Sequence, residues 1–274
     1  MPAAAPLART VEVGGQPLAV SVLGSGPPVL LLHGSGPGTT ASGAWRSTCA
    51  ALAERFQLVS PDQAGFGRTP MPGGRRAGRA LWTEQAMAVM DLLGHSRYAI
   101  VGHSMGGAVA LSVAAARPDA VRCVVGIGCM GAEMALPAGL DRLWAARPTR
   151  EDAERVLRLI AGDPEAPIAD DAVAARLETM RAQVGYPTLF PAPRERWVAD
   201  LALSAAEHAA VRRPVLLIHG ARDRIVPLRD GAVPLVEQLP VAHLYVLGDC
   251  GHSPHLERPE IVNRLITDFL ETDA

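Results

Sequence analysis

The chain has 274 residues, of which 49% are hydrophobic and 20% charged, and its formal net charge is -2 at pH 7. These values are typical of a globular protein, argue against a disordered chain and give no indication of nucleic acid as a partner. No segment is apolar over the roughly 20 residues that a membrane helix needs, and the first ten residues lack a signal-peptide pattern. We therefore expect no membrane association, a cytoplasmic location and one α/β domain with an inserted subdomain.

Strand-like patterns begin near the N-terminus and recur along the chain. Residues 10–24 alternate apolar and polar side chains around Gly14 and Gly15, which predicts an antiparallel hairpin at one edge of a sheet. Short continuous apolar runs, typical of strands buried on both faces of a parallel sheet, follow at 27–34, 56–62, 98–104, 121–128, 214–220 and 243–250.

Helical patterns separate these runs. Residues 79–94 have helical apolar spacing and end at a glycine, and residues 105–118 are small and apolar and end at a proline. Residues 259–271 start with proline and repeat Ile261, Leu265, Ile266 and Phe269 on one stripe, which is expected to pack on the sheet. The alternation predicts an α/β fold, with a mostly parallel sheet flanked by helices.

One interval, residues 131–208, breaks this alternation. It contains several helical stretches separated by proline-containing segments. We interpret it as a helical cap inserted into a core made of residues 1–130 and 209–274. Ligands of open α/β sheets bind at the carboxyl ends of the strands, so the cap is expected to cover the site and shape it. A purely stabilising insertion is the alternative interpretation.

The strongest catalytic pattern is the G-x-S-x-G sequence from Gly102 to Gly106, placed between a predicted strand and a helix of small residues. A serine on such a sharp turn takes strained backbone angles, and the two glycines leave room for close neighbours. The helix that follows would place its positive end at the serine. This pattern predicts that Ser104 is a nucleophile.

A serine hydroxyl needs a base within hydrogen-bond reach, and the base needs an acid that orients it. His252 and Asp223 follow two late predicted strands and complete the chain order serine, aspartate, histidine. The rival acids are Asp249, which is too close to His252 along the chain, and Asp62, which follows an earlier strand. We expect Asp223 to be the acid.

Backbone amides complete the expected machinery by binding the negative oxygen that develops in acyl-transfer chemistry. Met105 follows the nucleophile, and Ser35 lies in the glycine-rich run 33–38 after an early strand, so their amides are the candidate oxyanion hole. Serine, histidine, aspartate and these amides supply nucleophile, base and charge stabilisation, so neither an organic cofactor nor a metal ion is expected.

These motifs resemble the α/β-hydrolase superfamily, and in particular its carbon–carbon bond hydrolases, the meta-cleavage-product hydrolases such as 2-hydroxymuconic semialdehyde hydrolase. The similarity runs from near the first strand to the C-terminus. Its most specific parts are HGSGPG at 33–38, DCGH at 249–252 and the stretch FPAPRERWVADLA at 190–202. The resemblance implies a hydrolase that cleaves a C–C bond in a 2-hydroxy-6-oxo-dienoate, a ring-fission product of aromatic catabolism, or in a related diketone acid.

The resemblance also implies residues that bind the substrate. An arginine of the cap holds the substrate carboxylate in this family, and Arg176 occupies the matching position, where its guanidinium fork suits a carboxylate. Gly34, in the glycine-rich run, is expected to approach the substrate closely. From the residues alone, Arg176 has the alternative interpretation of a solvated surface charge.

Three positions depart from the family pattern. The family usually has asparagine where this chain has His103 and Ala44, and tryptophan where it has Ser253. His103 and Ser253 are then expected to contact a different substrate, which keeps an ester, lactone or thioester hydrolase as the alternative function. A binding protein that retains the fold without turnover is a third hypothesis. The expected partner is a small molecule, and the sequence leaves a homodimer or higher homo-oligomer open.

Overall fold

The computed structural model describes residues 7–183 and 185–272. In this part of the chain one eight-stranded sheet has the order β1-β2-β4-β3-β5-β6-β7-β8. The strands are β1 (Leu7–Val13), β2 (Gln16–Leu23), β3 (Pro28–Leu32), β4 (Gln57–Pro61), β5 (Tyr98–His103), β6 (Val121–Ile127), β7 (Val215–Gly220) and β8 (Ala242–Leu247). Strands β3 to β8 run parallel, whereas β2 is antiparallel to both β1 and β4. The predicted edge hairpin is confirmed.

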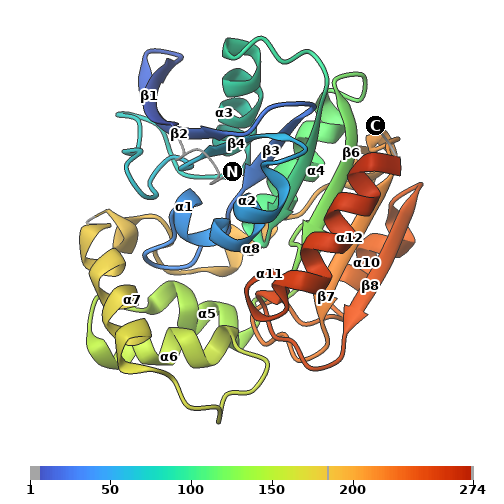
Figure 1. Cartoon of the computed structure of the whole chain (residues 1–274). Helices are drawn as coiled ribbons and strands as arrows, with labels where there is room; N and C mark the ends of the chain where they lie inside the picture. The colour runs from blue at the N-terminus through green and yellow to red at the C-terminus, as the bar shows by residue number, and fades with distance from the viewer. Residues whose placement is uncertain (1–6, 184, 273–274) are drawn as a thin grey trace.

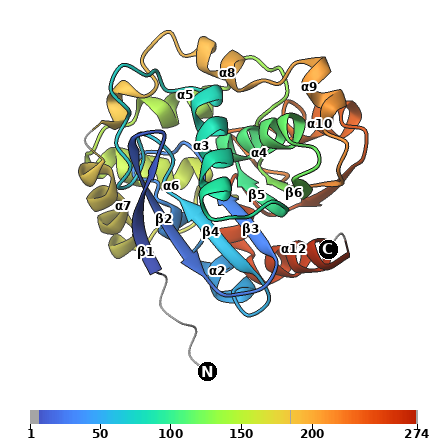
Figure 2. The same cartoon turned by 90° about the horizontal axis from the view of Figure 1, so that it is seen from above.

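Helices cover both faces of this sheet (Figure 1). They are α1 (Ala41–Ala44), α2 (Arg46–Leu52), α3 (Arg79–Leu92), α4 (Met105–Ala116), α5 (Ala138–Ala145), α6 (Arg150–Ile160), α7 (Asp170–Ala182), the 3-10 turn η1 (Tyr186–Thr188), α8 (Glu195–Leu201), α9 (Ala205–Ala210), α10 (Ala232–Gln238), α11 (Pro254–Glu257) and α12 (Pro259–Thr272). Seen from above, α3 and α4 lie on one face of the sheet, and α2 and α12 on the other (Figure 2). Two apolar cores, one on each face, hold the central strands, as expected for parallel strands.

One detail of the sequence prediction is wrong. Strand β8 is not buried on both faces, because it is the last strand of the sheet, and Tyr245 is 42% exposed. On α12 the predicted stripe packs on the sheet: Ile266 is fully buried, and Ile261, Leu265 and Phe269 are partly buried against the same core. Val262 and Leu270, which neighbour this stripe on the helix surface, are also fully buried.

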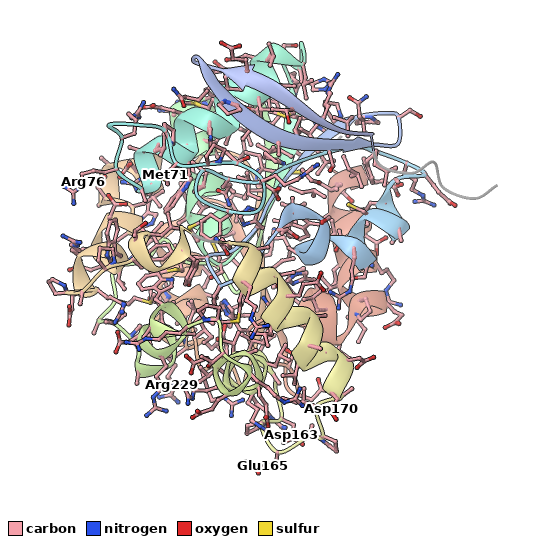
Figure 3. The ribbon with its side chains drawn as sticks, turned by 90° about the vertical axis from the view of Figure 1, so that its left-hand side faces the viewer. Met71, Arg76, Asp163, Glu165, Asp170 and Arg229 are labelled. Atoms are coloured by element: carbon pink, nitrogen blue, oxygen red, sulfur yellow. The ribbon has the colours of Figure 1, made fainter. Side chains whose placement is uncertain are left out.

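The segment between β6 and β7 is helical, as predicted. Helices α5, α6 and α7 lie together at one end of the sheet (Figure 1), and Asp163, Glu165 and Asp170 mark their outer end, far from β1 and β2 (Figure 3). The division at residues 131 and 208 stays a prediction. Among the described residues, no helix has the length and apolar content that crossing a lipid bilayer requires.

The last part of the inserted segment is tied to the core by Arg79 at the start of α3. Its backbone amide donates to Asp200 of α8 at 2.7 Å, and its guanidinium pairs with Glu207 of α9 at 2.6 Å. The hydrogen bond from Arg79 is the largest cause that lowers the pKa of Glu207 to about 2. Helices α8 and α9 are therefore held against α3 and α4. Helices α5 to α7 lie instead over the carboxyl ends of the strands.

Candidate active site

Ser104 lies between the end of β5 and the start of α4, on the sharp turn that the sequence predicts. Its φ of 55° and ψ of -119° make it the one non-glycine residue with positive φ among the described residues. A Cβ atom on Gly102 would collide with the carbonyl oxygen of Gly106, and one on Gly106 with that of Leu32. Because only glycine fits at both positions, the motif permits the backbone turn that brings Ser104 to the carboxyl end of the sheet.

Asp223 and His252 come together from two loops that follow β7 and β8. The Nδ1 atom of His252 lies 2.8 Å from Oδ2 of Asp223 and, as the donor, fixes the imidazole tautomer. The other oxygen, Oδ1, accepts the backbone amides of Ile225 and Val226 at 2.8 and 2.9 Å. This tautomer leaves Nε2 of His252 unprotonated, so the ring can accept a proton from a nucleophile.

A second histidine, which the sequence reasoning missed, supports the same carboxylate. Nε2 of His219 lies 3.3 Å from Oδ2 of Asp223 and 2.8 Å from the carbonyl oxygen of Val226. Burial alone would raise the pKa of Asp223, but the charge and hydrogen bonds of His252 and His219 outweigh it and hold that pKa far below its ordinary value. Asp223 is therefore an anion at neutral pH, although its side chain is buried. The available signal was the position of His219 in the same strand end, four residues before Asp223.

The two rival acids have other partners. Asp62 is buried and accepts the backbone amides of Ala41 at 2.7 Å and Arg68 at 3.0 Å. Asp249 is an exposed carboxylate that pairs with Arg258. Neither carboxylate orients His252, so the structure brings together the pair that the chain order favours.

The candidate oxyanion hole lies beside Ser104. Met105 is the first residue of α4, so its amide has no acceptor within the helix. The loop carrying Ser35 is fixed from the inserted segment: Trp144 donates from Nε1 to the hydroxyl oxygen of Ser35, and Tyr186 donates from its hydroxyl to the carbonyl oxygen, both at 2.9 Å. These two aromatic residues, also missed by the sequence reasoning, hold the backbone whose amide is the second candidate donor.

A cavity of about 560 Å³ opens over these residues. Its wall from α5 and α6 is apolar and includes Leu143, Val156, Leu157 and Ile160. Its polar wall includes the predicted site residues Gly34, Ser35, His103, Ser104, Arg176, His252 and Ser253. This volume suits a small organic molecule with an apolar body and a polar or anionic end.

Arg176 extends from α7 into this cavity and is half-buried, as the resemblance implies. Its Nη1 atom donates to the carbonyl oxygen of Pro37 at 3.1 Å. Burial, and then the charge of Arg46, lower the pKa of Arg176 from its ordinary value. An arginine forms five hydrogen bonds at most, so most of its donors are available to a ligand.

His103 also reaches the cavity, and its surroundings define its protonation. Nε2 of His103 donates to the carbonyl oxygen of His252 at 3.0 Å. Burial, followed by the charges of His255 and His252, holds the pKa of His103 well below its ordinary value. The ring is therefore neutral, and it lies beside Gly34, where a Cβ atom would be 3.0 Å from its Nδ1. His103 and Gly34 thus pack together next to Ser104.

His255 is buried beneath the same wall, with its ring 4.6 Å from that of His103 and 5.2 Å from that of Trp45. Burial, followed by the charge of His252, lowers its pKa from 6.5 to about 3. The folded chain then binds fewer protons than the unfolded chain between these two pH values. The free energy of unfolding must fall as pH decreases through this window, by about 1.4 kcal/mol per pH unit for this group.

We expect His255→Gln to remove this part of the acid sensitivity, because glutamine does not titrate. Urea unfolding at several pH values between 7 and 4.5 would measure it: the slope of unfolding free energy against pH should be smaller in the variant by up to about 1.4 kcal/mol per pH unit. His103 titrates in the same direction and keeps part of the slope in both proteins. Equal slopes in the two proteins would contradict a neutral, buried His255.

The strand order, the serine turn and the Asp223–His252 pair together define the α/β hydrolase class of protein. A family model described as "alpha/beta hydrolase fold" matches residues 27–259, and the chain belongs to this family. The chain is accordingly a hydrolase of the α/β fold.

Several hydrolases are similar to this chain in sequence or in structure. The 2-hydroxy-6-oxo-2,4-heptadienoate hydrolase of Pseudomonas putida strain F1 is 34% identical over 98% of each chain. The 2-hydroxymuconate semialdehyde hydrolase of Pseudomonas sp. strain CF600 is 35% identical over 92% of this chain and 89% of its own. Among solved structures, a variant of the meta-cleavage product hydrolase from Pseudomonas fluorescens IP01, complexed with acetates, has a TM-score of 0.93 and 31% identity, covering 97% of this chain and 98% of that one.

Proposed function

We propose that this chain is a serine hydrolase that cleaves a C–C bond in a 2-hydroxy-6-oxo-dienoate or a related diketone acid. One observation carries the proposal: Ser104, His252 and the guanidinium of Arg176 line the same cavity, so an acid can be bound while its distant carbonyl meets the serine. The relatives named as hydrolases of such dienoates, which match nearly the whole chain, support this substrate class.

In the proposed reaction, Arg176 binds the carboxylate and the dienol is first converted to its keto form. Nε2 of His252 then removes the proton from the hydroxyl of Ser104, or from a water molecule, as the oxygen adds to the distant carbonyl. The amides of Ser35 and Met105 donate to the resulting oxyanion. When the oxyanion collapses, the C5–C6 bond breaks, and its electron pair is delocalised into a dienolate that takes up a proton. If Ser104 was the attacking group, a water molecule deprotonated by His252 then hydrolyses the acyl-serine ester and returns the free hydroxyl. Overall one water is consumed, and an acid and a 2-hydroxydienoate are released.

The second candidate is an ester, lactone or thioester hydrolase that uses the same residues. The cavity carries His103 and Ser253, with Ala44 beside them, at positions where the resemblance implies two amides and an indole. A neutral imidazole, a hydroxyl and a methyl group offer other hydrogen bonds and less stacking surface. Each lost contact is worth on the order of 1 kcal/mol, which favours a modified acyl substrate.

Spectrophotometry separates these candidates. We expect the purified protein to bleach 2-hydroxymuconic semialdehyde or its 6-methyl analogue, which are yellow, because cleavage shortens the conjugated system. The kcat/KM for these dienoates should exceed that for 4-nitrophenyl butyrate by at least about 100-fold, which corresponds to the binding energy of a buried carboxylate–arginine contact. Efficient cleavage of the ester with no loss of the yellow colour would replace the first function by the second.

A further inference from the structure

A second arginine, Arg46 at the start of α2, lines the same cavity as Arg176. Its Nη1 atom makes one hydrogen bond, to the carbonyl oxygen of Gly43 at 3.2 Å, and the side chain is otherwise exposed to solvent at the cavity. Within residues 7–183 and 185–272, neither Arg46 nor Arg176 has a carboxylate partner within ion-pair distance. Two unpaired guanidinium groups therefore share one ligand-sized space.

The two guanidinium groups come from different helices. Arg176 comes from α7 and is anchored on Pro37, whereas Arg46 comes from α2 and is anchored on Gly43. Pro37 lies in the loop that connects β3 to α1, and Gly43 lies in α1 itself. Burial is the largest cause that lowers the pKa of Arg176, and the charge of Arg46 is the second. The two cations are therefore close enough to interact electrostatically. Like charges held together in this way are stabilised when an anion binds between them.

The other ionisable groups that the structure describes along the cavity form no ion pair with these two arginines. Glu257 also lines the cavity, and its two oxygens accept the backbone amides of Gly251 at 2.9 Å and Gly162 at 2.7 Å. Two histidines that line the cavity from α11 and β5, His255 and His103, have pKa values lowered by burial and are neutral at pH 7. A ligand carboxylate can therefore supply the anionic partner that neither arginine has within ion-pair distance among the described residues.

Resting on the hydrolase function above, we propose that Arg46 is a specificity-determining residue that binds the acidic end of the substrate together with Arg176. The substrate class is then restricted to carboxylic acids whose acidic end can be held by two guanidinium groups. A carboxylate has two oxygens with about four acceptor directions, so it can accept from two forks at once. Neutral acyl substrates gain nothing from this pair.

Two esters with the same leaving group test Arg46 directly. Mono-4-nitrophenyl adipate carries its carboxylate five bonds from the ester carbonyl, the spacing found in a 2-hydroxy-6-oxo-dienoate, and 4-nitrophenyl hexanoate has the same chain without the charge. Arg46→Gln should lower kcat/KM for the adipate ester about ten-fold, mainly through KM, and change that for the hexanoate ester less than two-fold. Arg46→Lys, which keeps the charge and loses the fork, should fall between the two.

The matched control is Arg97→Gln, an exposed arginine just before β5, at the end of that strand opposite Ser104. It should leave both esters unchanged. Equal effects of Arg46→Gln on the charged and uncharged esters, or no effect on either, would overturn the proposal. If neither ester is cleaved, calorimetric titration with adipate gives the answer: the dissociation constant should rise about ten-fold in Arg46→Gln, and an unchanged constant overturns the role of Arg46.

The outcome for Arg46 is separable from the outcome for the C–C hydrolase function. A wild-type protein that leaves the yellow dienoates intact but shows the charge-dependent effect of Arg46→Gln would refute C–C cleavage and retain the anion site. A protein that cleaves the dienoates with the same KM in wild type and Arg46→Gln would retain the function and refute the anion site.

Discussion

Ser104→Ala is expected to abolish catalysis, with kcat on a dienoate or ester substrate lower by about four to six orders of magnitude. The hydroxyl is the candidate nucleophile, or the group that positions water, and alanine can do neither. The variant is expected to fold as the wild type does, because the methyl group of alanine is smaller than the side chain that it replaces and fits in the same space. Stopped-flow and long steady-state assays would measure the residual rate, and substrate titration would show whether the variant still binds.

The control is Ser96→Ala, an exposed serine two residues before β5, which should keep the wild-type rate and melting temperature. The same pair of variants distinguishes an enzyme from a binding protein that keeps the hydrolase fold. A chain that only binds its ligand would show equally slow turnover in wild type and Ser104→Ala. That result would remove the hydrolytic role of Ser104, whatever the affinity of the site.

The fold could be predicted from local patterns because its central part obeys them strictly. Strands β3 to β7 are buried on both faces by α-helices, so each is a mostly apolar run. Where burial depends on what lies beside an element, the pattern fails. Strand β8 has an apolar run but lies at the sheet edge.

The candidate site shows the same division between local and distant information. Ser104, Asp223 and His252 could be located because each follows a strand and their chemistry requires a fixed chain order. Two supports of this site, Trp144 and Tyr186, contact a loop that is more than 100 residues away in the chain. The third, His219, lies at the end of β7, four residues before Asp223. For Trp144 and Tyr186, nothing in the local sequence predicts which backbone group they contact.

Positive charge in the cavity lies on groups other than the candidate reacting residues. The reacting groups are held by short, buried hydrogen bonds, and the nearby histidines His103 and His255 are kept neutral by burial. Positive charge is concentrated instead at Arg46 and Arg176, which lack anionic partners among the described residues. In the proposed function, the acidic end of the substrate is bound in one part of the cavity and the proton transfer at His252 takes place in another.

Asp223→Asn should lower kcat by about four orders of magnitude while leaving the geometry of the loop nearly intact. Oδ1 of Asp223 accepts two backbone amides, so the amide oxygen of asparagine is expected to take that position. The amide nitrogen would then replace Oδ2 and donate to Nδ1 of His252. A donor at this point forces the imidazole to carry its proton on Nε2, the atom that must accept a proton from the nucleophile.

Asp249→Asn is the matched control, since it makes the same chemical change in the rival carboxylate, three residues before His252. Asp249 is exposed and paired with Arg258, and we expect its variant to keep kcat within about two-fold, the small effect typical of surface ion pairs. Measuring kcat for both variants on one substrate decides between the acids. Loss of rate in Asp249→Asn with activity retained in Asp223→Asn would reverse the assignment. It would also require His252 to turn away from a carboxylate that lies 2.8 Å from its ring nitrogen.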